Sequence, residues 1–535
     1  MEVSLMKAAG AIAAIAAVAA VVVAPAHADT FTVANLDDMG SGSLRQAVLD
    51  ANATPGADTI VFGVSGTITL TSGELLVTDS LTIDGPGAAS LTISGNNASR
   101  VLTVGSSSVA LTVEGLTVAN GAAGGGDGGG IHSYDGTLTV ANSIFSGNSA
   151  EYGGAINNFG GTVAVANTIF SGNSASSSGG GINSYGAATV SNSVFTGNSA
   201  ARGSGGGIAG GPLTVTDSTF TGNSVPGGNG GGVANGGVAT VTNSTFSGNS
   251  AEAGGGISNG GSLALTNSTL AGNAAGFFGG GAIWNSGTLT ATNSTLSGNS
   301  AGDLGGGGIL NWPSGADTPH LRNTIVANNS DGNCSGTMID EGGNLQYPGT
   351  DCGGSITSAD PLLDPAGLQD NGGPTKTIAL QPASPAIDTA VLATCPPTDQ
   401  RGVSRPQGAG CDVGAFELNA LTVAIDIKPG GFPNSINVSK KGTIPVAVLG
   451  TPTFDPADVD PGTVCFGDAE EPDQRDCSIA SMPVMEDVNG DGILDLVLRF
   501  ETPETGIDLG DTQACLTGQT FGGVSIEGCD SVKVK

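Results

Sequence analysis

Hydrophobic and polar positions repeat with a period of about 25 residues between residues 121 and 330. Each unit holds a glycine run that ends in an aliphatic residue, an alternating apolar segment, and a phrase close to Asn-Ser-Thr-Phe-Ser-Gly-Asn. This synchrony predicts an internal repeat with a registered core, which a disordered chain does not need. The aliphatic positions lie 24 to 26 residues apart, at Ile131, Ile156, Ile182, Ile208, Val233, Ile257, Ile283 and Ile309. A second apolar column holds Phe145, Phe170, Phe195, Phe220 and Phe246, then Leu270, Leu296 and Val326.

The units predict short β-strands rather than helices. Glycine and β-branched residues crowd every unit, and both disfavour an α-helix. Apolar residues alternate with polar ones before each turn, as Leu138 and Val140 do before Asn142, which is typical of a strand with one buried face. Units with about three such strands stack roughly 4.8 Å apart, so the sequence predicts a parallel β-helix, with right-handed connections as the default.

Two asparagine columns keep the same period. We expect both to lie in turns and to form ladders of side-chain amides, because asparagine tolerates left-handed backbone angles. The first column runs through Asn142, Asn167, Asn192, Asp217, Asn243, Asn267, Asn293 and Asn323. The second runs through Asn148, Asn173, Asn198, Asn223, Asn249, Asn273 and Asn299.

Different elements are predicted at the two ends of the repeats. The segment Ser43 to Asn52 is amphipathic, and a short helix there would cap the open end of the solenoid. From about Leu421 the repeats stop, and alternating segments predict a separate β-sandwich-like domain. The predicted fold class is therefore all-β: a right-handed parallel β-helix with an N-terminal capping helix and a C-terminal β domain.

Three segments resemble known bacterial modules. Gly153-Gly154-Ala155-Ile156 and Phe170-Ser171-Gly172-Asn173 resemble the repeats of polymorphic outer membrane proteins. Gly42-Ser43-Leu44-Arg45-Gln46-Ala47 resembles the CSLREA region of secreted β-helix proteins, with Gly42 in place of the cysteine. Asp399-Gln400-Arg401-Gly402 and Asp412-Val413-Gly414-Ala415-Phe416-Glu417 are similar to the choice-of-anchor Q module. These resemblances imply a right-handed β-helix with a surface or extracellular address, and they imply no reaction.

The chain divides into five predicted parts. Residues 1–28 read as a signal peptide, with Lys7, an apolar stretch and a small-residue cleavage pattern at Ala26-His27-Ala28. The alternative, an uncleaved membrane anchor, needs a longer apolar run. The other parts are an N-terminal cap with the first coils (29–120), the repeats (121–330), the anchor-Q-like module (331–420) and a C-terminal domain (421–535). We expect a secreted or cell-envelope-associated protein with no transmembrane segment in its mature chain.

Charge and cysteines narrow the possible partners and the compartment. A formal net charge of −32 argues against nucleic acid as a partner. Export makes disulfides plausible for the eight cysteines, although eight cysteines permit 105 pairings. Pairing of sequence neighbours is the simplest: Cys334 with Cys352, Cys395 with Cys411, Cys465 with Cys477 and Cys515 with Cys529.

One segment predicts a metal site. Residues 487–495 place side-chain oxygens at positions one, three, five and nine around a glycine turn, which suits a structural calcium ion. An EF-hand is not expected, since Leu498 occupies position twelve, and the alternative is a hairpin turn with solvated carboxylates. The predicted ligands are the side chains of Asp487, Asn489, Asp491 and Asp495 and the backbone carbonyl of Ile493.

Two functions fit a solenoid of this composition. A lyase needs a base and a cation, and a hydrolase needs convergent carboxylates, but residues 121–320 hold one arginine and no lysine. After residue 28 the histidines are His132 and His320. The sequence therefore favours a scaffold or adhesin-like protein without catalytic activity that contacts glycans or cell-surface components. The alternative is a polysaccharide-active enzyme of the pectate lyase kind, for which stacking could bring Asp127 and Glu151 together.

Overall fold

The computed structural model describes most of the chain outside its first residues. The predicted signal peptide, apart from His27 and Ala28, lies outside the described residues. The structure describes residues 27–312, 317–408, 410–469, 475–479, 481–521 and 524–535.

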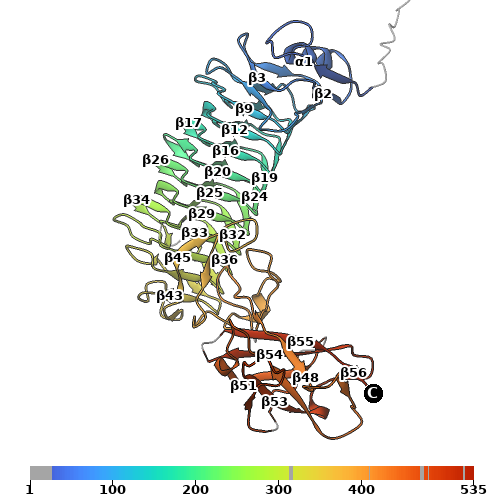
Figure 1. Ribbon diagram of the computed structural model, residues 1–535. Coiled ribbons are helices and arrows are strands. Elements are labelled where there is room, and N and C mark those ends of the chain that lie inside the picture. Colours follow the sequence, from blue (N-terminus) through green and yellow to red (C-terminus); the bar gives the residue numbers. More distant parts are fainter. Residues whose placement is uncertain (1–26, 313–316, 409, 470–474, 480, 522–523) are drawn as a thin grey trace, which may run out of the picture.

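The chain folds into a parallel β-helix of about 12 turns, as the repeats predict (Figure 1). Two sheets of 13 strands and one of 11 strands run along it. Sheet A extends from β1 (Thr30–Val33) to β42 (Ile339–Asp340), and sheet B from β3 (Gly66–Thr69) to β44 (Thr357–Ser358). Sheet C extends from β4 (Leu75–Val77) to β41 (Cys334–Ser335). A shorter sheet D begins at β13 (Ser149–Tyr152) and ends at β34 (Ala274–Gly279).

The predicted apolar columns form the core of the solenoid. Strand β12 (Ile144–Ser146) pairs in register with β16 (Ile169–Ser171), so that Phe145 lies opposite Phe170. The stack of five phenylalanine rings is fully buried, with centroids 4.6 to 5.1 Å apart. Each such burial contributes about 1.5–3 kcal/mol.

Both asparagine columns occupy turns, and both form amide ladders. Members of the first column have positive φ angles, such as 49° at Asn142. In the second, buried column, Nδ2 of Asn148 donates to Oδ1 of Asn173 at 2.9 Å, and the bond repeats from coil to coil. The first ladder is interrupted at Asp217, whose carboxylate has no N–H to donate, and again at Asn267 and Asn293, which donate instead to backbone carbonyls of the segment that follows the solenoid.

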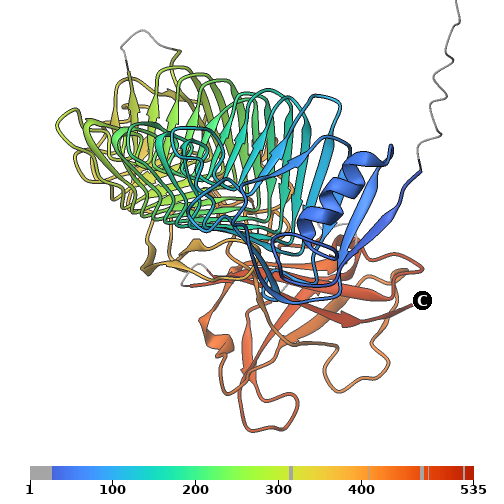
Figure 2. The same ribbon diagram turned by 90° about the horizontal axis from the view of Figure 1, so that it is seen from above.

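A short helix closes the N-terminal end. Helix α1 (Leu44–Ala53) begins after Ser43, whose side chain accepts a hydrogen bond from the N–H of Gln46. Figure 2 shows α1 across the end of the solenoid. Its buried face is the predicted one, consisting of Leu44, Ala47, Val48 and Ala51.

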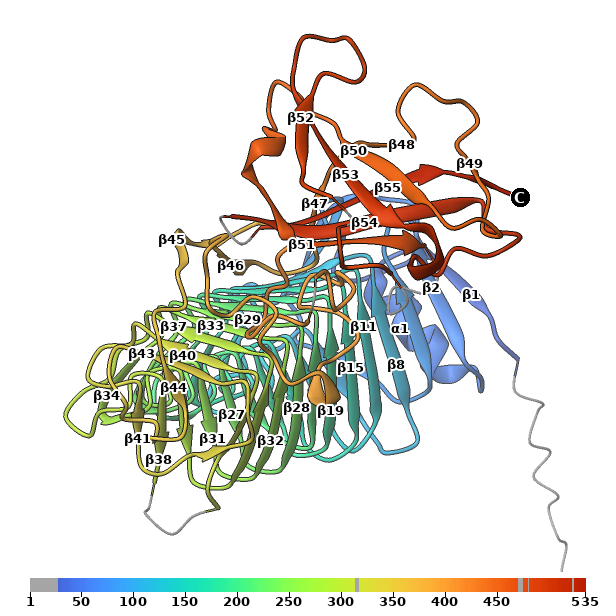
Figure 3. The ribbon, with the colours of Figure 1, turned by 90° about the horizontal axis from the view of Figure 1, so that it is seen from below.

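The segment after the solenoid folds back over sheet B. It contains β45 (Leu363–Gln369) and β46 (Thr377–Leu380), which Figure 3 shows between the solenoid and the C-terminal domain. The hydroxyl of Thr245 in sheet B donates to the carbonyl oxygen of Lys376 at 2.6 Å. This segment therefore covers the later coils of sheet B, where Thr245, Thr269 and Thr295 are buried, whereas Ile169 on an earlier coil is 41% exposed.

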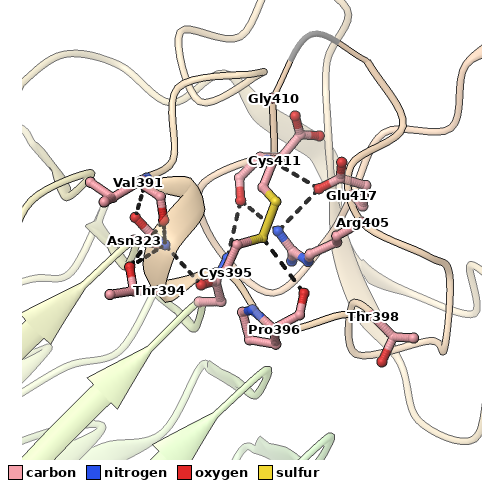
Figure 4. The surroundings of a disulfide bond; sticks show 12 residues. Asn323, Val391, Thr394, Cys395, Pro396, Thr398, Arg405, Gly410, Cys411 and Glu417 are labelled. Carbon is pink, nitrogen blue, oxygen red and sulfur yellow. Dashed lines mark hydrogen bonds and ion pairs between the residues drawn. A yellow bond between two sulfur atoms is a disulfide. The ribbon is translucent and has the colours of Figure 1, made fainter. Parts of the chain in front are cut away.

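Paired charges hold this covering segment together. The guanidinium of Arg405 lies 3.0 Å from the carboxylate of Glu417, both buried beside the Cys395–Cys411 disulfide (Figure 4). Arg401 pairs with Asp399 at 2.7 Å and stacks over the ring of Phe416. Both arginines of this segment thus pair with nearby carboxylates.

The C-terminal residues form a separate β domain around Phe466 and Phe500. One of its two four-stranded sheets has the order β47 (Leu421–Thr422), β55 (Ser525–Ser531), β54 (Gln513–Thr520) and β51 (Val459–Asp468). The other has the order β48 (Ile425–Ile427), β50 (Thr443–Val448), β53 (Asp495–Glu501) and β52 (Val484–Glu486).

All eight cysteines pair with their sequence neighbours, as the simplest pairing predicts. Among the residues that the structure describes, no helix has the length and apolar character needed to cross a membrane.

Candidate functional site

The side chains on the outward face of sheet C change from polar to small and then to apolar along the solenoid. Most of its strands have three residues, and the middle one points away from the core by the alternation of a strand. The strands are β4, β7 (Leu102–Val104), β10 (Ile131–Ser133), β14 (Ile156–Asn158), β18 (Ile182–Ser184), β23 (Ile208–Gly210), β27 (Val233–Asn235), β31 (Ile257–Asn259), β35 (Ile283–Asn285), β38 (Ile309–Asn311) and β41. From β7 to β38 the outward row is Thr103, His132, Asn157, Asn183, Ala209, Ala234, Ser258, Trp284 and Leu310.

A hydrogen-bonded chain of polar side chains runs along this row and then stops. Nδ2 of Asn183 donates to Oδ1 of Asn157 at 2.7 Å, so the amide of Asn157 is left to donate from Nδ2 to Nδ1 of His132 at 3.2 Å. The next residue of the row is Ala209, which offers no polar side chain. Oδ1 of Asn183 therefore accepts no hydrogen bond from any residue that the structure describes, although Asn183 is only 4% exposed.

The same row of hydrogen bonds fixes the tautomer of His132. Because Nδ1 accepts from Asn157, the proton of the neutral ring lies on Nε2. Burial, and then the positive charge of Arg100, lowers the pKa of His132. The imidazole is thus held neutral, with its Nε2–H as a hydrogen-bond donor.

An exposed aromatic column lies beside the polar row. The residue after each sheet C strand is Tyr134, Phe159 and Tyr185 on three successive coils, with exposed fractions of 50%, 45% and 59%. The rings of Tyr134 and Phe159 stack with centroids 5.1 Å apart, and Phe159 meets Tyr185 edge to face at 5.8 Å. The column then loses its rings, because the equivalent positions are Gly211, Gly236, Gly260 and Ser286.

A groove of about 470 Å³ lies where the rings are missing. Its lining runs from Tyr185 to Trp284, four coils or roughly 19 Å along the solenoid axis. Ala209, Ala234 and Ser258 belong to its floor, because they are the small residues of the outward row. The groove is also lined by polar residues from sheet D, namely Ser178 in β17 (Ser174–Ser178), Ser204 in β22 (Gly203–Ser204) and Asn229 in β26 (Ser224–Asn229).

Charged groups meet at the N-terminal end of the same face. Nη1 of Arg100 contacts Oε2 of Glu74 at 2.5 Å and the hydroxyl of Thr103 at 3.0 Å, while its Nε donates to backbone carbonyls. Farther along, the N–H of Glu151 donates to the carbonyl oxygen of Gly126. The segments that carry Asp127 and Glu151 are thus side by side on successive coils, as stacking predicts.

The predicted calcium loop connects β52 to β53 in the C-terminal domain. The carboxylate of Asp487 accepts from the N–H groups of Gly490 and Gly492, at 2.7 and 2.9 Å. Asp495 is buried and accepts from the N–H groups of Gly450 and Val488. These bonds hold the loop in a compact turn.

The carboxylates of this loop do not converge on a common centre where an ion could bind. Among the described residues, only Cys515, Glu527 and Cys529 form a group of three or more close His, Cys, Asp or Glu ligand atoms, and those cysteines form a disulfide. Calcium at Asp487, Asn489, Asp491, Ile493 and Asp495 stays a prediction.

No family model matches this chain, and no curated protein matches it. The resemblances to the polymorphic outer membrane protein repeats, the CSLREA region and the choice-of-anchor Q module therefore stay predictions.

Solved β-helix structures do resemble the chain at low identity. A mannuronic acid-specific polysaccharide lyase of family 6 from the human gut microbiota is 10% identical, with a TM-score of 0.31; the match covers 62% of this chain and 91% of that one. The family 6 alginate lyase AlyGC is 16% identical, with a TM-score of 0.38 and coverage of 76% and 61%. The A-module of mannuronan C-5 epimerase AlgE6 from Azotobacter vinelandii is 15% identical, with a TM-score of 0.28 and coverage of 60% and 100%.

These neighbours are polysaccharide lyases and an epimerase. Their activities belong to those proteins. The function of this chain has to be inferred from its own residues.

The groove was not predicted from the sequence. Its signal is present in the repeat, three residues after each aliphatic position: Ile182 is followed by Tyr185, whereas Ile208 and Val233 are followed by Gly211 and Gly236. Whether that column faces solvent depends on which sheet the covering segment occupies, and the repeat does not contain that information.

Proposed function

We propose that this protein is an extracellular β-helix that binds a polysaccharide along the outer face of sheet C. The observation that carries the proposal is the groove between Tyr185 and Trp284, with the free acceptor of Asn183 in its lining. Sugar rings combine apolar C–H faces with hydroxyl groups, so they fit a site that combines aromatic rings with amides and hydroxyls. An extended polymer also suits a groove that follows the solenoid axis. Four disulfides support an oxidising, extracellular compartment.

The lining of the groove supports binding as its role. A glycan-cleaving site needs an acid and a base close to the scissile bond. The lining residues carry amide, hydroxyl, aromatic and aliphatic groups, and none is Asp, Glu, His, Lys or Arg. The proposal therefore keeps the scaffold or adhesin-like reading of the sequence and assigns it a glycan partner.

Polysaccharide processing is the second candidate, and one observation favours it. Glu74, Arg100 and His132 lie together at the N-terminal end of the same face, beside the exposed ring of Tyr134. A guanidinium can neutralise the carboxylate of a uronate while a neighbouring group moves a proton. Here Arg100 is already bonded to Glu74, and His132 offers a proton from Nε2 rather than a free Nδ1.

One paired experiment tests both candidates. The full mature chain is titrated calorimetrically with a panel of polysaccharides, and the same mixtures are assayed for new reducing ends and for new double bonds. We expect binding without turnover, and at least a tenfold weaker affinity for Tyr185→Ala. The control is Val238→Ala, which removes an equally exposed apolar side chain from sheet A.

Two results would change the conclusion. Turnover that is lost in His132→Ala makes the second candidate the function. Equal affinity of the wild type and Tyr185→Ala, or no binding to any polymer, overturns the first proposal.

A further inference from the structure

The groove is uncharged in a strongly acidic protein. The chain has a formal net charge of −32, yet no lining residue is charged. Arg100, the arginine paired with Glu74 at the N-terminal end of this face, lies on a coil three turns before that of Asn183. The lining of the groove thus offers neither a carboxylate to bind a cation nor a guanidinium to bind an anion.

A side-chain acceptor in the groove lining adds a second demand on the ligand. Oδ1 of Asn183 faces the coil of Ala209, because Nδ2 of the same amide is held by Asn157 on the opposite side. This oxygen is reached by solvent, so a ligand that displaces water from it has to offer a hydrogen-bond donor in its place. A sugar hydroxyl supplies such a donor, whereas a carboxylate placed at this point offers only acceptors.

From these two observations we infer that the groove selects an uncharged polysaccharide. This inference rests on the proposed function and names the substrate class of the same site. Sugar rings lie against Tyr185 at one end and Trp284 at the other, and a hydroxyl donates to Oδ1 of Asn183. A uronate polymer is disfavoured, because its carboxylates would lose water without gaining a cation and would approach an acidic protein.

The groove can be filled by a single substitution. A Cβ built on Gly236 meets no atom within 4 Å, and Gly236 is not among the glycines with positive φ. The equivalent position three coils earlier in the column carries Phe159, so an aromatic side chain suits this backbone. Gly236→Trp therefore blocks the groove without strain in the solenoid.

A matched control exists in the C-terminal domain. Gly442 is also exposed, a Cβ built there also meets no atom within 4 Å, and its φ is also not positive. Gly442→Trp adds the same apolar surface far from sheet C. Thermal unfolding of both variants checks that each retains the wild-type fold.

The experiment compares neutral soluble polymers, such as galactomannan and mixed-linkage glucan, with alginate and polygalacturonate. We expect the wild type and Gly442→Trp to bind at least one neutral polymer, and Gly236→Trp to bind it at least tenfold more weakly. Asn183→Ala should lose about tenfold in affinity. Neither uronate polymer should bind in the groove.

The outcomes separate this inference from the proposed function. If a uronate polymer binds, no neutral polymer binds, and Gly236→Trp abolishes the binding, the ligand is not uncharged. The proposal that a polysaccharide binds sheet C then still stands. Neutral binding that is unchanged in Gly236→Trp and in Tyr185→Ala overturns both. If a neutral polymer binds more weakly to Tyr185→Ala but equally well to Gly236→Trp, the groove is not the binding site, while the proposal that a polysaccharide binds sheet C stands.

Discussion

The hydroxyl of Thr269 donates a hydrogen bond of 2.7 Å to Oε1 of Gln400, a residue 131 positions later in the chain. Nε2 of the same Gln400 side chain donates to the hydroxyl of Thr245 on the preceding coil at 2.8 Å. One buried carboxamide thus joins two coils of sheet B to the segment that covers them. This contact helps to hold the covering segment on sheet B rather than on sheet C.

Loss of this carboxamide should destabilise the covering segment. Gln400→Ala leaves buried hydroxyl groups on sheet B without their partner, and we expect the free energy of unfolding to fall by about 1–3 kcal/mol. Urea denaturation, followed by circular dichroism, measures the change. Gln407→Ala is the control, since its half-buried side chain bonds only within its own loop. Equal midpoints for the two variants would contradict this role of Gln400.

The phenylalanine stack should carry a large share of the local stability. The ring centroid of Phe195 lies 4.6 Å from that of Phe170 and 4.7 Å from that of Phe220, and the ring is fully buried. Phe195→Ala should lower the free energy of unfolding by about 3–5 kcal/mol. Tyr185→Ala, which removes an exposed ring from the coil that carries Phe195, should change it by less than about 0.5 kcal/mol. Similar losses in both variants would mean that Phe195 is not a core residue.

Much of the fold follows from periodicity alone. The phenylalanine and aliphatic columns lie in the interior because equivalent residues of parallel strands stack on one another. The first asparagine column lies in turns with left-handed backbone angles, as expected for asparagine. Helix α1 was predicted because its apolar residues share one face. These features depend on local sequence and on a constant repeat.

The site depends on contacts that no repeat contains. Oδ1 of Asn183 lacks a partner because the next coil places Ala209 opposite it. The aromatic column is accessible to a ligand because the covering segment lies on sheet B. The first fact depends on a difference between neighbouring coils, and the second depends on how a distant segment packs on the solenoid. The calcium loop shows the opposite case, since its motif is visible in the sequence while the structure holds its carboxylates in hydrogen bonds to backbone amides.

The stability of the covering segment should fall as pH rises through neutrality. Burial, and then the nearby charge of Glu417, raises the pKa of Asp412 from 3.8 to about 7. The folded state therefore holds a proton that the unfolded state releases above pH 4, so this contribution to stability is complete below about pH 4 and is lost as pH rises through 7. We expect the melting temperature to be several degrees higher at pH 5 than at pH 8.

Substitution of Asp412 tests the origin of that dependence. Asp412→Asn keeps the size of the side chain and removes its titration, so the difference in melting temperature between pH 5 and pH 8 should shrink. Differential scanning calorimetry across this range measures it. Asp370→Asn, at an exposed turn, should keep the wild-type dependence. A profile of Asp412→Asn that matches the wild type would assign the pH dependence to other groups.

Calcium should stabilise the C-terminal domain through the loop between β52 and β53. Hard cations prefer several oxygen ligands, and the side chains of Asp487, Asn489, Asp491 and Asp495 with the carbonyl of Ile493 supply them once the loop closes around the ion. At a calcium concentration of about 100 times Kd, the free energy of unfolding of the domain should rise by about 2.7 kcal/mol. Calorimetric titration gives Kd, and Asp491→Ala should weaken it at least tenfold. Asp511→Ala removes a carboxylate from another turn of the same domain and should leave Kd unchanged. A titration without heat, with no change in melting temperature on addition of calcium, would leave the loop as a hairpin turn that is held by its own backbone amides.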